Sequence, residues 1–308
     1  KPEFGFKPKT HMEIGLNKGW IDKERAVKVA GSRFVYLKGD MVRLEMALMQ
    51  YGIDRLSDER FIKKVAAKSK LKTSTRPFVP VLPPAMAKTE VYDATARLDK
   101  EETTYKLADD ELWLNASAEH TLVPMHMKEI LNADELPLRY VGYTTAFRRE
   151  AGSYGKDIEG IIRLHQFNKL EMESFTTEEG GLDEHILLVM LQRELLEELG
   201  LPYQLLQKCT ADIGGPNASG WDINCWMAGQ GKYLETHTAD YMTDYQARRL
   251  GTRYKAGQGG ENKLVHTNDA TVFSERPLIA IIENNQTEDG DVKVPEALQK
   301  YMGGRKTI

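Results

Sequence analysis

The sequence lacks the features that mark several common protein classes. It has only two cysteines in 308 residues, Cys209 and Cys225, which is too few for a disulfide framework. The two also lack the spacing of a zinc site, so we expect no structural zinc. So few cysteines favour a reducing compartment, and we expect a cytoplasmic protein. No apolar run approaches the roughly 18 residues of a membrane-spanning helix, so we expect no membrane partner.

The sequence also lacks a strong excess of charge of one sign, and it lacks several catalytic sequence patterns. The net charge is −4, so the chain has no overall basic signature of a nucleic-acid-binding protein, although a local basic patch can coexist with an acidic average. The phosphate-binding pattern GxxxxGK[ST] is absent, and "GQGK" at 229–232 is too short to replace it. The nucleophile elbow GxSxG and the zinc-protease pattern HExxH do not occur either.

The residues that are present predict one large globular domain over residues 1–308. An apolar fraction of 41% is enough for a core. Apolar spacing predicts an amphipathic helix over 39–56, which Asp40 could cap, and a longer helix over 183–202, which Asp183 could cap. Alternating patterns around turn signals predict antiparallel hairpins. Long helices mixed with such hairpins indicate an α+β fold with an antiparallel sheet as its platform.

The most informative hairpin has arms at 141–148 and 160–173 around a charged, glycine-rich loop. Alternate residues of a strand share a face, so Arg148 and Glu150 point the same way if the first arm continues. One face of the second arm carries Arg163, His165, Phe167, Lys169 and Glu171. Such a face is either a solvated surface with cross-strand ion pairs or a nucleotide site. In a nucleotide site the ring would stack on a base and the guanidinium groups would bind phosphate oxygens.

The order of several segments resembles a known family. Residues 144–172, "TTAFRREAGSYGKDIEGIIRLHQFNKLEM", closely resemble motif 2 of the class II aminoacyl-tRNA synthetases, in the form typical of seryl-tRNA synthetases. Residues 31–56 with 78–86 resemble motif 1. Residues 233–255 resemble the family's metal-ligand strand with its Gln-Ala-Arg-Arg segment. Residues 265–286 with 292–304 resemble motif 3 and the family's C-terminus. The resemblance spans roughly residues 10–304. It implies the class II catalytic fold, an antiparallel β-sheet flanked by helices.

The resemblance implies an ATP site in which two arginines are catalytic. Arg148 would bind the α-phosphate and the amino acid carboxylate, and Arg276 of motif 3 would cover the adenine opposite Phe167. Glu150 would meet the adenine amino group and Arg163 the far phosphates. The cofactor would be Mg²⁺, bound by Glu235 and Thr238. The implied ATP contacts are Arg148, Glu150, Arg163, Phe167, Glu235, Thr238 and Arg276, with Glu283 as a further candidate for ATP or metal.

A serine pocket is implied as well, formed by Ser117, Glu119, Arg148, Glu171, Asn268 and Thr271. Glu171 would accept a hydrogen bond from the serine hydroxyl. Motif 3 is one residue shorter here than the common pattern, so Asp269 competes with Asn268, and Ala270 competes with Thr271. The family's small Ser-Ser-Cys-Ser segment is replaced by residues 236–239. His237 in that segment has either a packing role, which we favour, or a role at the metal.

The implied activity is that of a serine–tRNA ligase. Serine and ATP would give seryl-adenylate and pyrophosphate, and the serine would pass to the 3′ end of tRNA(Ser). The implied partners are ATP, L-serine, the acceptor end of the tRNA, and a second copy of the chain, packed through the motif 1 helix. Loop 152–159 would close over ATP. The family's N-terminal tRNA-binding arm is absent from these residues, and we expect that it was removed. Two alternatives are an amino acid:carrier-protein ligase and a non-catalytic synthetase-like binding protein.

Overall fold

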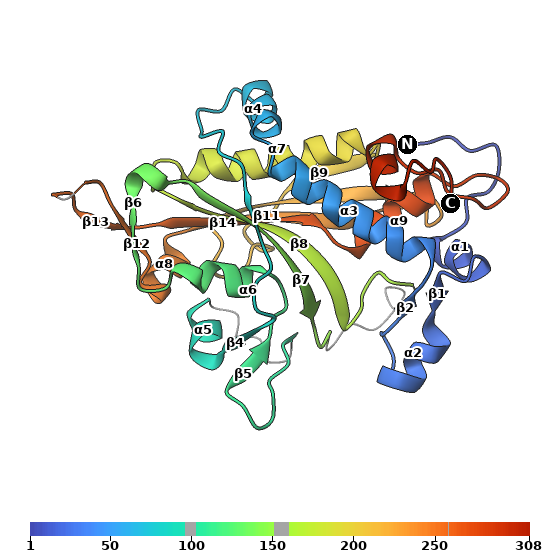
Figure 1. The fold of residues 1–308 in the computed structure, drawn as a ribbon, viewed down its shortest axis with the longest axis horizontal. Coiled ribbons are helices and arrows are strands. Elements are labelled where there is room, and N and C mark those ends of the chain that lie inside the picture. The colour runs from blue at the N-terminus through green and yellow to red at the C-terminus, as the bar shows by residue number, and fades with distance from the viewer. Residues whose placement is uncertain (96–102, 151–159, 258) are drawn as a thin grey trace.

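The computed structural model describes residues 1–95, 103–150, 160–257 and 259–308. A seven-stranded sheet in the order β3-β7-β8-β14-β11-β10-β9 organises it (Figure 1). All neighbouring strands are antiparallel except β3 and β7, which are parallel. The strands are β3 Val79–Val81, β7 Leu138–Phe147, β8 Gln166–Thr176, β9 Tyr203–Gln207, β10 Ser219–Met227, β11 Lys232–Thr243 and β14 His266–Phe273. The predicted α+β fold with an antiparallel sheet is confirmed.

Short strands and helices surround this sheet. The small strands are β1 Ile21–Asp22, β2 Tyr36–Leu37, β4 Met86–Lys88, β5 Leu112–Leu114, β6 Ile130–Asn132, β12 Arg253–Lys255 and β13 Asn262–Leu264. The helices are α1 His11–Asn17, α2 Lys23–Ala30, α3 Asp40–Leu56, α4 Glu59–Lys68, α5 Thr89–Ala94, α6 Glu119–Leu122, α7 Gly181–Glu198, α8 Tyr245–Leu250, α9 Glu275–Asn284 and α10 Glu296–Gln299. Within the described ranges, no helix combines the length and the apolarity needed to cross a bilayer.

Helices α3, α7 and α9 cover one face of the sheet and form the main core with it. The apolar spacing of α3 buries Leu44, Leu48 and Leu56 completely, which confirms the predicted amphipathic helix. Gly52 lets α3 approach the sheet closely, because a Cβ there would lie 2.8 Å from Leu170 Cδ2. On the other face of the sheet, α6 contacts β7 and β8, and α8 contacts β11 and β14.

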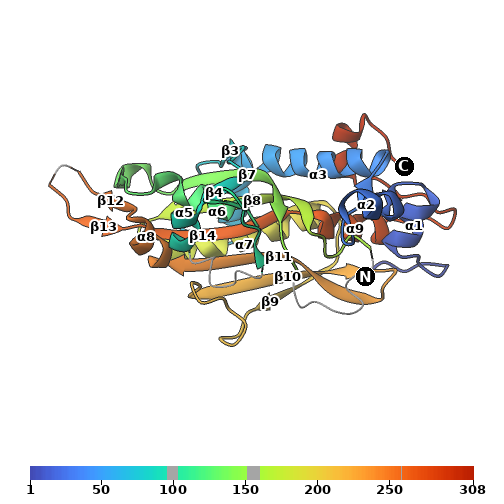
Figure 2. The same ribbon diagram turned by 90° about the horizontal axis from the view of Figure 1, so that it is seen from below.

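The segments at the two ends of the chain lie at the same end of the sheet, together with α1, α2 and α9, whereas β12 and β13 lie at the opposite end (Figure 2). Lys9 N donates to Gln286 Oε1 over 2.7 Å, and His11 Nδ1 lies 2.8 Å from Glu283 Oε1. Glu283 is therefore fully buried against the N-terminal segment. The prediction that Glu283 contacts ATP or metal is wrong, because this carboxylate is already enclosed by His11 and by the N–H groups of Gly229 and Gln230.

Both predicted helix caps are wrong, although the helices themselves are confirmed. Gly39 is the N-cap of α3, with φ +61°, and Asp40 instead binds Arg305 through a 2.6 Å contact. Helix α7 begins at Gly181, two residues before Asp183, and no side chain caps it. An acidic residue in the first turn is still favoured by the helix dipole, which explains why the pattern resembled a cap.

The charged hairpin is confirmed as β7 and β8, but its second arm starts later than predicted. Pairing begins at Phe147 opposite Gln166, and residues 160–165 form turns. Ile161 and Ile162 turn into the core, which takes the chain off the sheet before the strand begins. Phe167, Lys169 and Glu171 therefore share a strand face as predicted, whereas Arg163 and His165 do not belong to it. The predicted lid, loop 152–159, lies outside the described residues.

Candidate active site

The site lies where two neighbouring strands of the sheet, β11 and β14, separate, and we call this point the fork of the sheet. Strands β11 and β14 are paired from Thr243 opposite Thr267 to Ala239 opposite Ala270, and beyond that point their ladder stops. The next residues on the two strands are Thr238 and Thr271. The fork exposes the ends of both strands to one cavity, which has about 630 Å³ of empty volume and is partly open to solvent.

A β-bulge turns the predicted metal ligands to the same side of β11. Two residues of a strand that are three apart normally face opposite sides of the sheet. Here β11 carries one extra residue, Thr236, between the positions that pair with Ile223 and Asn224. Glu235 and Thr238 therefore share a face, and both line the cavity.

Apart from Glu283, the predicted ATP contacts all line this single cavity. They are Arg148, Glu150, Arg163, Phe167, Glu235, Thr238 and Arg276. The Arg148 guanidinium carbon lies 5.1 Å from the centre of the Phe167 ring. Arg163 Nη1 donates to Glu150 Oε2 over 2.9 Å, and Arg276 Nη1 donates to Glu235 Oε1 over 3.0 Å. Arg163 reaches the cavity from the turn before β8 and not from the strand face on which the sequence pattern placed it.

The residues predicted to bind the amino acid lie buried beside those predicted to bind ATP, and we call these two sets the amino-acid half and the ATP half of the site. Glu171 accepts from Ser117 Oγ, from Lys169 Nζ and, over 3.2 Å, from the Glu119 backbone N–H. Lys169 also donates to Ser117 Oγ over 3.1 Å. Burial opposes ionisation of Glu171, but the Lys169 ammonium and these hydrogen bonds hold its pKa below the ordinary value. The carboxylate is therefore charged in the folded protein.

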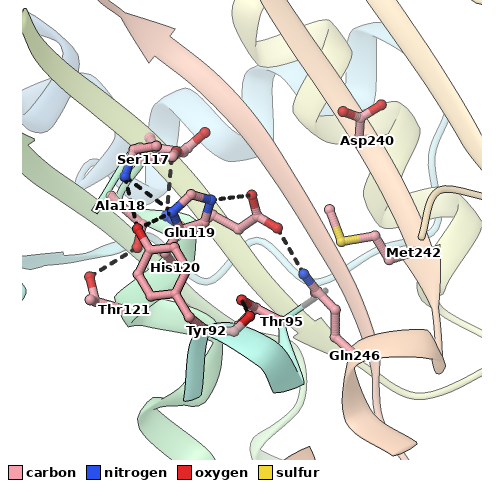
Figure 3. A network of polar contacts seen from close by, with 12 residues as sticks. Tyr92, Thr95, Ser117, Ala118, Glu119, His120, Thr121, Asp240, Met242 and Gln246 are labelled. Carbon is pink, nitrogen blue, oxygen red and sulfur yellow. Dashed lines mark hydrogen bonds and ion pairs between the residues drawn. The ribbon is translucent and has the colours of Figure 1, made fainter. Parts of the chain in front are cut away.

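Glu119 is held from two sides, and Figure 3 shows its carboxylate between the His120 ring and the Gln246 amide. Gln246 Nε2 donates to Glu119 Oε1 over 2.8 Å, and His120 Nε2 lies 3.9 Å from Oε2. On its far side the His120 ring contacts the Tyr92 hydroxyl, 2.9 Å from Nδ1. Glu119 is therefore a buried carboxylate with fixed partners rather than a mobile surface carboxylate.

Arg148 links the two halves of the site. Its Nε donates over 3.2 Å to the carbonyl oxygen of Ala116, the residue before Ser117. Its guanidinium lies at the Phe167 ring, in the half expected to bind ATP. A ligand with a carboxylate in the buried pocket and a phosphate in the open cavity could therefore meet the same cation.

Strand register decides between the two alternatives that motif 3 left open. Thr271 pairs with Glu171, so both side chains face the site. Asp269 is two residues before Thr271 and shares this face. Asn268 and Ala270 face the opposite side, and Asn268 Nδ2 donates to the Gly181 carbonyl of α7 over 3.3 Å. The choice of Asn268 as a serine contact is therefore corrected to Asp269, and Thr271 is favoured over Ala270.

The residues that could hold Mg²⁺ offer oxygen donors, the type that this cation prefers. Glu235 supplies a half-exposed carboxylate and Thr238 a hydroxyl. Lys208 Nζ donates to Thr238 Oγ1 over 2.6 Å and also contacts Asp240 and Asp222. The described parts of the chain contain no cluster of three or more His, Cys, Asp or Glu side chains suited to a metal ion. A cation held by this pair would take its remaining ligands from phosphate oxygens and water, and it would share Thr238 with the Lys208 ammonium and Glu235 with Arg276.

His237 packs into the protein, as favoured from the sequence. It is almost fully buried, and burial lowers its pKa to about 3, so the ring is neutral. Its Nδ1 lies 2.7 Å from Thr236 Oγ1, and its ring packs edge-on against Phe273. Because of the bulge it faces away from Glu235 and Thr238.

Sequence reasoning missed some side chains of the site. Lys169 was placed on the correct strand face but was given no role, although its position between Phe167 and Glu171 was a usable signal. Lys208 and Asp222 had no such signal, because they come from β10 and the segment after β9, and neither belongs to a quoted motif. Only the sheet brings them to Thr238.

Comparisons with known proteins identify the family. Residues 103–285 match the family model described as the tRNA synthetase class II core domain (G, H, P, S and T). A serine–tRNA ligase of Thermococcus gammatolerans is 40% identical over 306 residues, which are 98% of this chain and 63% of that protein. The chain thus spans less than two thirds of that relative's length.

Solved structures give the same result. Seryl-tRNA synthetase from Pyrococcus horikoshii complexed with ATP superimposes with a TM-score of 0.90 at 39% identity, over 99% of this chain and 65% of that one. The cytoplasmic serine–tRNA ligase from Naegleria fowleri in complex with AMP gives 0.87 at 32% identity, over 100% and 69%. The fold, the family model and the relatives agree, and the chain belongs to the seryl-tRNA synthetase family of class II aminoacyl-tRNA synthetases.

Proposed function

We propose that this chain is the catalytic domain of a serine–tRNA ligase. It would activate serine with ATP, release pyrophosphate, and transfer serine from the adenylate to the 3′ end of tRNA(Ser). The observation that supports this most directly is the position of Arg148, between a buried pocket of carboxylates and an open cavity lined by cations and an aromatic ring. Adenylate formation joins a carboxylate to a phosphate, and it needs such a cation at the junction.

In the ATP half, Arg163 is paired with Glu150 and Arg276 with Glu235, and a bound nucleotide could replace these contacts. Arg163 would leave Glu150 for the far phosphates, and Glu150 could then accept from the adenine amino group. Phe167 and Arg276 would enclose the base. Mg²⁺, held by Glu235 and Thr238, would neutralise phosphate charge when bound. Arg148 would stabilise the negative charge that builds on the α-phosphate oxygens as the serine carboxylate attacks, and no protein nucleophile is needed.

In the amino-acid half, the charge balance suits serine. The buried carboxylates of Glu119, Glu171 and Asp269 outnumber the one ammonium among them, that of Lys169, so this half of the site keeps excess negative charge for the substrate's ammonium group. Arg148 would bind the substrate carboxylate, while Glu171 and Thr271 would bind the hydroxyl. Alanine would leave polar groups of this buried pocket without a partner, and so it would be rejected strongly. Threonine would be rejected only by size. The resulting serine set is Ser117, Glu119, Arg148, Glu171, Asp269 and Thr271.

We also propose a homodimer formed through α3 and β3. Met46 of α3 is 66% exposed and Leu82, just after β3, is 82% exposed, and Val79 in β3 is more than half exposed. These apolar side chains come from elements on the same side of the molecule (Figure 2). Apolar groups on an exposed helix and an edge strand suit a symmetric interface with a second copy. The cytoplasmic location and the contact with the tRNA acceptor end stay predictions.

The test is amino-acid-dependent ATP–pyrophosphate exchange over all twenty amino acids without tRNA, followed by aminoacylation of tRNA(Ser). Exchange with serine, and far weaker exchange with alanine and threonine, supports the proposal. Exchange with a different small amino acid would move the function towards a carrier-protein ligase. No exchange with any amino acid, despite a folded protein, would favour a non-catalytic binding protein.

A further inference from the structure

Gln192 is a buried polar residue with leucines beside it on the buried face of a helix. It lies in α7 beneath the sheet and is fully buried. Its neighbours on that face, Leu188, Leu191 and Leu195, are also fully buried. Placing an amide among leucines is unfavourable unless the amide is hydrogen-bonded, so this side chain must have partners.

The partners of Gln192 are backbone groups at the fork of the sheet. Its Nε2 donates to the carbonyl oxygen of Thr238 over 2.9 Å and to that of Thr271 over 2.7 Å. These are the first residues of β11 and β14 beyond their last pair, Ala239 opposite Ala270. Buried carbonyl groups that leave a ladder need other donors, and an amide nitrogen with two hydrogens supplies both at once.

The two carbonyl groups belong to residues on opposite halves of the proposed site. Thr238 carries the hydroxyl assigned to the metal, and Thr271 carries the one assigned to the serine pocket. We propose that Gln192 is a positioning residue. Its amide connects the backbones of β11 and β14 from the α7 side of the sheet and sets the spacing of the two threonines. This inference rests on the proposed function. It adds that one side chain outside the cavity sets the geometry of both substrate sites.

The chain offers a matched control in Asn284 of α9. Its Nδ2 also donates to two backbone carbonyl oxygens, those of Trp226 over 2.7 Å and Ala280 over 2.8 Å, and it too is buried. Neither carbonyl belongs to a residue that lines the cavity. Substitutions of Gln192 and Asn284 therefore each remove two hydrogen bonds from a buried amide to backbone carbonyl groups, at the site and away from it, and one of the Asn284 bonds lies within its own helix.

The experiment compares Q192E and Q192M with N284D and N284L. For each we would measure the unfolding free energy in urea, the KM for serine and for ATP in pyrophosphate exchange, kcat, and the ATP affinity by calorimetry. We expect the Gln192 variants to raise KM for both substrates and to weaken ATP binding, each by roughly tenfold, because two hydrogen bonds are lost. The Asn284 variants should lose comparable stability while their KM values stay within about twofold of the wild type.

Folded Gln192 variants with wild-type KM values and wild-type ATP affinity would overturn the inference. Equal KM shifts in the Asn284 variants would overturn it as well, because the effect would then follow general stability. Wild-type protein without serine-dependent exchange would instead contradict the proposed function. In that case the ATP affinities of the same four variants still decide the role of Gln192.

Discussion

The two halves of the site differ in how far their paired charged side chains are exposed to solvent. In the ATP half the paired side chains are partly exposed, and Glu235 is 53% exposed in its pair with Arg276. In the amino-acid half the Glu171 side chain is 0% exposed and lies against Lys169. Exposed pairs contribute little to stability and exchange partners easily, whereas a buried pair is costly to break. The ATP half is therefore suited to exchanging carboxylates for phosphates, and the amino-acid half to keeping a rigid shape.

The largest expected effect tests the rigid half. K169M would leave the Glu171 carboxylate buried without its ammonium partner, and we expect the unfolding free energy to fall by about 3–5 kcal/mol. The double variant K169M/E171Q removes both charges and should recover most of that loss. Urea unfolding measures both. If K169M is as stable as the wild type, Lys169 is not the group that compensates Glu171.

The next effect tests the junction between the halves. R148A should reduce serine-dependent pyrophosphate exchange by about 10²–10³-fold, because a charge aimed at the transition state is lost. Stability should change by less than about 1 kcal/mol, since the side chain is only half-buried. R148K should not restore activity, because an ammonium cannot bind two groups in the guanidinium geometry. Normal exchange in R148A would contradict the motif 2 assignment.

A smaller effect tests whether the two halves of the site bind their substrates independently. F167A should raise KM for ATP by roughly 5–150-fold, the range that corresponds to about 1–3 kcal/mol for stacking of a base on an aromatic ring. KM for serine should stay unchanged, because Phe167 belongs to the ATP half. F167Y keeps the ring and is the control. An equal rise in both KM values would show that the two halves are not independent.

The last effect depends on pH and concerns Glu275, which lines the cavity beside Phe167. Burial, reinforced by the nearby Glu45, raises the pKa of Glu275 to about 8. The unfolded chain ionises this group near its ordinary pKa of about 4.3. Between these values the folded state keeps a proton that the unfolded state has lost, so stability falls as pH rises, by at most about 1.4 kcal/mol per pH unit.

E275Q cannot ionise, so it should flatten this dependence. We would measure the unfolding free energies of E275Q and of the wild type at pH 6 and at pH 8. The unfolding free energy of E275Q minus that of the wild type should be larger at pH 8 than at pH 6. The same difference at both pH values would mean that Glu275 is already ionised at pH 6.

Much of the site could be read from local patterns. The alternation of Phe167, Lys169 and Glu171 depends only on strand geometry, and the structure keeps these side chains on one face. The position of Arg163 could not be read this way, because the buried pair Ile161 and Ile162 draws the chain away from the sheet just before β8. Local periodicity contains no information about where such a competing core contact begins.

The sequence by itself determined the two long helices α3 and α7, the hairpin of β7 and β8 and the chemistry available to them, because helix and strand periods are properties of neighbouring residues. Tertiary structure alone decided which side chains meet. Asp269 rather than Asn268 faces the site because of the register with Glu173 on β8 and Asp240 on β11. Glu283 is enclosed by His11, which is 272 residues away along the chain. Pairings of this kind depend on how distant segments pack, and no local pattern can specify them.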